Sequence, residues 1–389
     1  MHSLPPEALT LEPVWINNDQ LLADYCQRWS NLAAIALDTE FVRTNTFYPQ
    51  PGLIQVSTGQ AIFLIDPLLI SDWQPLARLF DHGSVVKVLH ACGEDLEVFK
   101  LLTGTVPRPL FDTQLAAAFA NLGFSLGYQT LLKQLLNVDL PKDETRSNWR
   151  QRPLTEAQVR YACLDVRHLL AVYQELQQQL TKAAKQFWLE DDCLALTLSV
   201  LPHDPDNAWK EVKKAWQLRP QQLLVLKALC HYREVAARQQ DLPRNRILPK
   251  GSLWSLARFQ PATIAALKRT PEMSPSVIRH HGEKILAIIH HAGQLPEAQR
   301  PEKLPLPLPK TAREMGNRIK SLLIKQSTEL ELPSELLMSG KLTTPLLRGW
   351  LADGQFSVPD TLTGWRRDVI GVPLVAQLNQ LIQTEQDAQ

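Results

Sequence analysis

Apolar residues in the first half of the chain alternate between short β-type runs and longer helical patterns. The apolar runs predict strands at 33–37, 53–57, 61–65 and 85–89. Thr58-Gly59-Gln60 separates the second run from the third, which predicts an antiparallel hairpin. Helical periodicity occurs at 76–80, 95–102, 112–120, 128–136 and 155–180. This alternation is typical of an α/β domain.

Beyond residue 200 the pattern is helical throughout, and two proline-rich breaks divide it. The first break lies at 201–209, and the second, at 295–310, contains five prolines and predicts an extended spacer. Helical patterns between the breaks cover 207–212, 220–239, 251–257, 261–269 and 274–292. After the spacer they cover 312–325, 333–339, 343–351, 361–369 and 373–384. We therefore predict one α/β domain at 1–203 and two small all-α domains at 207–292 and 310–386.

The composition excludes a membrane protein and favours the cytoplasm. Of the 389 residues 44% are hydrophobic and 21% are charged, and no stretch offers the roughly 20 apolar residues of a membrane span. The N-terminal segment lacks the basic start and apolar core of a secretory signal. Five cysteines without a C-x-x-C pair argue against a disulfide framework.

Charge is distributed unevenly along the chain. Residues 1–206 carry 15 basic and 24 acidic residues, a net charge of −9, whereas residues 207–290 carry 15 and 5, a net charge of +10. The remaining residues hold 11 of each. This division favours an acidic catalytic part and a part that binds a polyanion, although basic helix faces also occur simply as solvated surface.

Acidic residues occur in three motifs, two at predicted strands and one on a predicted helix. Asp38 and Glu40 lie two positions apart on a strand, so both side chains leave the same face and suit a divalent cation. Asp95 follows the strand that ends at residue 89, where α/β sheets collect their sites. Tyr161 and Asp165 lie four apart on a predicted helix and share a face. Taken singly, each motif is also explained by an ordinary strand end, helix start or helix surface.

Together, in this order, the motifs resemble the DEDD exonuclease superfamily in its tyrosine-bearing branch. The segments AIALDTEFVRTNTFYPQPGLIQV, VVKVLHACGEDLEVF and SNWRQRPLTEAQVRYACLDVRHLL are similar to those of the bacterial ribonuclease D family. The resemblance covers residues 14–200 closely. Residues 221–284 look like the helicase-and-RNase-D C-terminal (HRDC) domain, and those after 309 like a degenerate second copy. The implied fold is ribonuclease-H-like, with a mixed five-stranded sheet flanked by helices.

The resemblance implies a 3′–5′ exoribonuclease that releases 5′-mononucleotides with two divalent cations, Mg²⁺ or Mn²⁺. In this interpretation Asp38 bridges both cations, Glu40 and Asp165 hold the one that carries the attacking water, and Asp95 acts in the outer shell of the other. Tyr161 orients the water. The resemblance also favours precursors of transfer RNA as substrates, and we expect a monomer.

Two alternatives remain open at this point. A 3′–5′ DNA exonuclease uses the same carboxylates, and a catalytically silent RNA-binding or scaffold protein needs only the basic part. Weaker candidates for RNA contact in the family-like segments are Arg43, His90, Lys142, Trp149 and Arg150. Each is equally explained by a structural role, and a tryptophan such as Trp149 is more often a core or packing residue. In the basic part we expect Lys210, Lys213, Lys214, Arg219, Arg244, Arg246 and Lys250 to grip the RNA backbone.

Overall fold

The computed structural model describes residues 12–141, 147–200, 204–337 and 340–387. These residues form two compact units. The first contains the described parts of Met1–Val42, Pro51–Val200 and Leu308–Gln389, and the second those of Arg43–Gln50 and Leu201–Pro307. Each unit is described by itself below.

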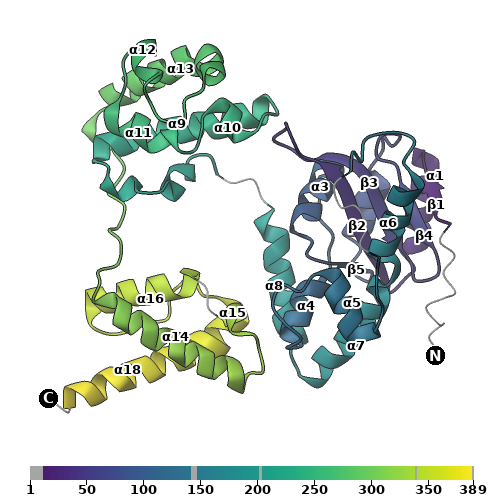
Figure 1. Cartoon of the computed structure of the whole chain (residues 1–389). Coiled ribbons are helices and arrows are strands. Elements are labelled where there is room, and N and C mark those ends of the chain that lie inside the picture. The colour runs from purple at the N-terminus through teal and green to yellow at the C-terminus, as the bar shows by residue number, and fades with distance from the viewer. Residues whose placement is uncertain (1–11, 142–146, 201–203, 338–339, 388–389) are drawn as a thin grey trace. The chain divides into compact units, whose positions relative to one another are not determined.

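A six-stranded mixed sheet organises the first unit, in the order β1-β4-β3-β2-β5-β6 (Figure 1). Its strands are β1 Val14–Ile16, β2 Ala34–Val42, β3 Gln50–Ser57, β4 Ile62–Ile65, β5 Val86–Leu89 and β6 Leu110–Asp112. Strand β3 pairs antiparallel with β4, as the hairpin prediction requires, with Ser57 opposite Ile62. Pairings β1–β4, β2–β5 and β5–β6 are parallel.

The predicted α/β class is confirmed, but the expected number of strands, five, is too low. Strands β1 and β6 were not predicted from the pattern. Each has only three residues, which is too short for an alternating or continuous apolar run to stand out. Their existence depends on neighbours distant in sequence, since β1 pairs with β4 and β6 with β5.

Eight helices accompany this sheet in the described nuclease-like part of the first unit. They are α1 Asp19–Trp29, α2 Gln74–Phe80, α3 Gly93–Thr103, α4 Thr113–Phe119, α5 Tyr128–Leu136, α6 Glu156–Arg167, α7 Leu169–Lys182 and α8 Gln186–Ser199. The single helix predicted at 155–180 is in fact two, because buried His168 ends α6 and begins α7. Ile35, Ala36 and Leu37 of β2 are fully buried, so the strand that leads into Asp38 is anchored in the core.

The helices after residue 308 belong to the first unit, and the one at Gly364–Arg366 packs on α8. They are α14 Ala312–Glu329, α15 Ser334–Leu337, α16 Gly340–Asp353, α17 Gly364–Arg366, the π-helical turn η5 Arg367–Gly371 and α18 Val372–Asp387. Asp192 of α8 accepts hydrogen bonds from the guanidinium of Arg366 and, at 3.0 Å, from Trp365 Nε1. Trp365 also stacks on Trp188, with ring centroids 5.0 Å apart. This pairing ties the C-terminal helices to the α/β part of the first unit.

All the regular secondary structure described in the second unit after residue 203 is helical. It contains η2 Ala208–Glu211, η3 Ala215–Gln217, α9 Pro220–Gln239, α10 Arg244–Ile247, α11 Ser252–Phe259, α12 Ile264–Leu267, α13 Pro275–Gln294 and η4 Glu297–Gln299. Fully buried Leu226, Leu229 and Ile285 lie in its core. The segment Arg43–Gln50 also belongs to it, since Asp241 accepts the backbone N–H groups of Phe47 and Tyr48 at 3.0 and 2.9 Å.

Among the described residues, no helix combines the length and the apolar character that crossing a bilayer demands.

Candidate active site

Three carboxylates meet where β2 faces α6. Oxygen atoms of Asp38, Glu40 and Asp165 all lie within 4.8 Å of one another. Alternation along β2 places the first two on one face, and α6 supplies the third. Oxygen ligands this close together, and only partly buried, suit a hard divalent cation.

Burial and mutual repulsion make this cluster costly in its fully ionised form. Burial, followed by the charges of Asp95, Asp165 and Glu40, raises the pKa of Asp38 well above its usual range. Burial and the charges of Asp165 and Asp95 raise the pKa of Glu40 to about 9. Burial also raises the pKa of Asp165 to about 7, against the Tyr161 hydrogen bond that lowers it. A bound cation would relieve this repulsion, so the donor set fits a divalent metal.

Asp95 joins the site from α3, where it is the third residue of the helix. Apart from burial, its charge is the largest cause that raises the pKa of Asp38, which places it beside the cluster. The hydroxyl of Thr39 donates a 2.5 Å hydrogen bond to Asp95 Oδ1. Burial raises the pKa of Asp95 to about 7, and the Thr39 hydrogen bond is the largest effect that lowers it. Thr39, which the sequence reasoning missed, therefore orients this acid.

We expect Thr39→Val to weaken catalysis by roughly tenfold, because the valine keeps the shape of the threonine but no longer donates to Asp95. Without that hydrogen bond the pKa of Asp95 rises further above 7, so the acidic limb of the activity profile moves to higher pH. The measurement is kcat against pH from 6 to 9 on an RNA oligomer. Thr103→Val is the matched control, since Thr103 is also buried but bonds the Phe99 carbonyl within α3. An unmoved acidic limb in Thr39→Val would contradict the role.

The turn that delivers Asp95 is held by Asp112. Asp112 accepts from the backbone N–H groups of Ala91 and Cys92 at 3.3 and 2.9 Å, and its Oδ1 also caps the first turn of α4. Ala91 adopts a φ of 54°, which a residue with a Cβ rarely takes. These hydrogen bonds stabilise the turn between β5 and α3 and thereby fix where α3 begins.

Helix α6 is positioned by the segment before it. A capping box between Thr155 and Gln158 starts the helix. Arg152 makes two 2.6 Å hydrogen bonds to Asp66 and one of 2.7 Å to the Gly52 carbonyl, so the preceding segment is tied to the sheet. These contacts fix the position of α6 relative to the sheet, and thereby where Tyr161 and Asp165 enter the site.

The candidate RNA-contact residues in the family-like segments differ in burial and in hydrogen bonding. Trp149 is 2% exposed, with its ring 5.9 Å from that of Tyr161, so its placement favours the packing role. His90 is half-buried, and its Nδ1 lies 2.9 Å from Thr113 Oγ1. Arg150 is exposed. Arg43 donates to the Phe47 carbonyl within the second unit. Lys142 lies outside the described residues.

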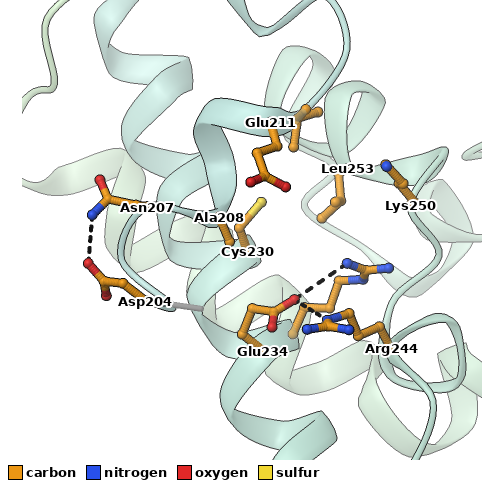
Figure 2. A pocket seen from close by; sticks show the side chains of 11 residues that line it. Asp204, Asn207, Ala208, Glu211, Cys230, Glu234, Arg244, Lys250 and Leu253 are labelled. Carbon is orange, nitrogen blue, oxygen red and sulfur yellow. Dashed lines mark hydrogen bonds and ion pairs between the residues drawn. The ribbon is translucent and has the colours of Figure 1, made fainter. Parts of the chain in front are cut away.

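Six of the seven basic candidates of the helical unit are exposed, namely Lys210, Lys213, Lys214, Arg219, Arg246 and Lys250. Arg244 differs, because its Nε donates a 2.6 Å hydrogen bond to buried Glu234. Arg244 and Lys250 line a cavity of about 400 Å³, with Asp204 and Asn207 on its other side (Figure 2). RNA contact by these residues stays a prediction.

The fold and the acidic site together indicate a 3′–5′ exonuclease, and comparisons with known proteins support this class. A family model described as 3′-5′ exonuclease matches residues 13–181, and the HRDC domain model matches residues 222–289. Ribonuclease D of Pseudomonas paraeruginosa (strain DSM 24068 / PA7) is 45% identical over 364 residues, which cover 94% of this chain and 97% of that protein. Ribonuclease D of Escherichia coli (strain K12) is 39% identical over 371 residues, with 92% and 96% covered.

The solved structure of a ribonuclease D also matches this chain over almost its whole length. The crystal structure of Escherichia coli RNase D, described as an exoribonuclease involved in structured RNA processing, superposes with a TM-score of 0.88 at 37% identity. The match covers 95% of this chain and 99% of that one. The chain therefore belongs to the ribonuclease D family, and it is a hydrolytic 3′–5′ exoribonuclease.

Proposed function

We propose that the protein shortens the 3′ ends of transfer RNA precursors, one nucleotide at a time, with two divalent cations, Mg²⁺ or Mn²⁺. The observation that carries the metal part is the cluster of Asp38, Glu40 and Asp165, whose oxygens lie within 4.8 Å of one another. The RNA part is supported by relatives named ribonuclease D at 39–45% identity.

Each acidic residue of the site has its own proposed role in holding the cations. Asp38 would bridge both cations, Glu40 and Asp165 would hold one, and Asp95 would act in the outer shell of the second. Bound cations would activate the attacking water and stabilise the leaving 3′ oxygen. The carboxylates would supply the negative charge that holds the cations, and the Thr39 hydrogen bond would help to orient Asp95.

Tyr161 would orient the attacking water rather than remove its proton. Burial, followed by the charges of Asp165, Glu40 and Asp38, raises the pKa of Tyr161 above its usual value. The hydroxyl therefore stays protonated at neutral pH and serves as a hydrogen-bond donor and acceptor. Its own hydrogen bond to Asp165 lowers the pKa of that acid, which favours the ionised form needed for metal binding.

The substrate proposal rests on a direct comparison. The full-length protein with Mg²⁺ is given a transfer RNA precursor with extra 3′ nucleotides, an unstructured RNA oligomer and the matching DNA oligomer. We expect 5′-mononucleotide release from both RNAs and much slower release from DNA. Degradation of the oligomer without trimming of the precursor would reject the transfer RNA substrate and leave the exoribonuclease intact. Faster release from DNA would favour a DNA exonuclease.

We also propose a cytoplasmic monomer. All five cysteines are free and buried, as is usual in a reducing compartment. Measuring the mass of the protein in solution tests the monomer, and a dimer would contradict it.

A further inference from the structure

An aromatic pair at the end of α11 has no function assigned to it so far. Phe259, the last residue of the helix, is 72% exposed, the highest value of any large hydrophobic side chain among the described residues. Its ring centroid lies 6.2 Å from that of Trp254, and the two ring planes meet at 88°. Perpendicular rings do not stack face to face, so Phe259 presents a ring face to solvent at this exposure.

Trp254 gives the pair a rigid base. Its indole Nε1 donates a 3.1 Å hydrogen bond to the Lys214 carbonyl, and its ring packs against the core of the second unit. The Lys214 carbonyl belongs to a closed turn, in which the Ala215 N–H donates to the Val212 carbonyl at 3.1 Å. A ring held in this way loses little conformational entropy when a ligand binds to the pair.

Basic residues from three segments adjoin the pair. Arg258 directly precedes Phe259, and its Nη1 lies 3.5 Å from Gln222 Oε1. The same oxygen accepts the backbone N–H of Arg219 at 2.9 Å. The turn that anchors Trp254 supplies two lysines. The four basic residues around the pair are all exposed, namely Lys213, Lys214, Arg219 and Arg258.

We propose that this face of the second unit is a base-stacking site for single-stranded RNA. An unpaired base stacks on Phe259, and the phosphates on either side of it contact the surrounding lysines and arginines. Bases within a duplex are already stacked on one another, so the site favours unpaired RNA. It does not select a sequence, because every base has an aromatic face. This inference rests on the proposed RNA substrate.

The competing interpretation is that Phe259 is one of the single apolar residues found on any protein surface. Phe187 of α8 provides the comparison, because it is 66% exposed but is followed by Glu190 and Asp191 one helical turn later. Those acidic neighbours would repel a phosphate backbone. The charge around the ring therefore distinguishes Phe259 from an ordinary exposed phenylalanine.

The test measures how tightly the full-length protein binds a labelled single-stranded RNA and an RNA duplex, with a chelator present to prevent hydrolysis. Leucine stays apolar but lacks the ring, so Phe259→Leu should weaken single-strand binding roughly 5- to 100-fold and duplex binding by less than about twofold. Phe259→Tyr keeps the ring and should bind like the unmodified protein. The salt dependence of binding should not change, because the phosphate contacts remain.

Two controls separate stacking from a general loss of binding. Phe187→Leu should leave both affinities unchanged. An abasic nucleotide at the stacked position should weaken binding by the unmodified protein but hardly affect Phe259→Leu, because the stacking partner is already gone.

Unchanged single-strand affinity in Phe259→Leu, or equal losses for single strand and duplex, would overturn the inference. Loss of self-association in Phe259→Leu without loss of RNA affinity would also overturn it and assign the pair to a protein contact. In each case mononucleotide release by the unmodified protein would leave the proposed function standing. Absence of that release with Mg²⁺ present would instead reject the proposed function.

Discussion

Asp38→Asn should abolish hydrolysis while RNA binding persists. Asparagine keeps the shape of aspartate but loses the charge that would bridge two cations, at the position whose pKa the charges of all three other acids raise. Because metal catalysis is worth several kcal/mol, we expect kcat to fall by about 10³-fold or more. Initial rates of mononucleotide release measure this, and filter binding at fixed salt measures RNA affinity, which should change by less than about threefold.

The control for Asp38→Asn is the same substitution at an exposed site. Asp139 is 76% exposed and pairs with Lys133 at 2.6 Å, so Asp139→Asn removes one charge from the same unit without touching the cluster. It should leave kcat unchanged. Comparable turnover by Asp38→Asn and the unmodified protein would reject the assignment of the active site.

Affinity for divalent metal should rise steeply with pH. In the metal-free folded protein burial raises the pKa of Glu40 to about 9 and those of Asp95 and Asp165 to about 7. Metal binding must displace these protons, so affinity grows about tenfold per pH unit for each proton released. We expect an increase of at least about 100-fold between pH 6 and 8, which is what the single proton of Glu40 contributes, measured as Mn²⁺ dissociation constants. An affinity independent of pH would contradict the proposed ligands.

The same groups set the stability of the metal-free protein. Their pKa values are higher in the folded state than the roughly 4 of the unfolded chain, so the folded protein holds protons that the unfolded chain has released. Their stabilising contribution is complete below pH 4 and is lost as pH rises through 7 to 9. With a chelator present, the melting temperature should therefore fall between pH 6 and 9, and added Mn²⁺ should restore it. Asp38→Asn should show much less of this restoration.

Local signals predicted much of the fold correctly. The pattern at 220–239 gave the bounds of α9, and that at 128–136 those of α5. Helix α8 was missed because its apolar residues do not lie on one face, since it packs against β6, α4 and α17 at once. The break at His168 was missed for a similar reason, because the local pattern there continues without a proline or glycine.

The residues of the candidate site also fall into two groups, those that the sequence predicted and those that it missed. Asp38, Glu40, Asp95, Tyr161 and Asp165 could be named because their spacing within each motif and the order of the motifs are visible in sequence. Thr39 could not, because its hydroxyl meets Asp95, 56 positions later in the chain. Such partners depend on packing between distant segments.

We propose that carboxylates from β2, α3 and α6 hold two divalent cations around one RNA phosphate. Crystals of the full-length protein with Mn²⁺ and a short, uncleavable RNA test this arrangement through the anomalous scattering of manganese. We expect two manganese peaks within coordination distance of Asp38, one of them also bound by Glu40 and Asp165, with the terminal phosphate between them. Manganese peaks found only away from Asp38, with the RNA terminus at another site, would contradict this arrangement.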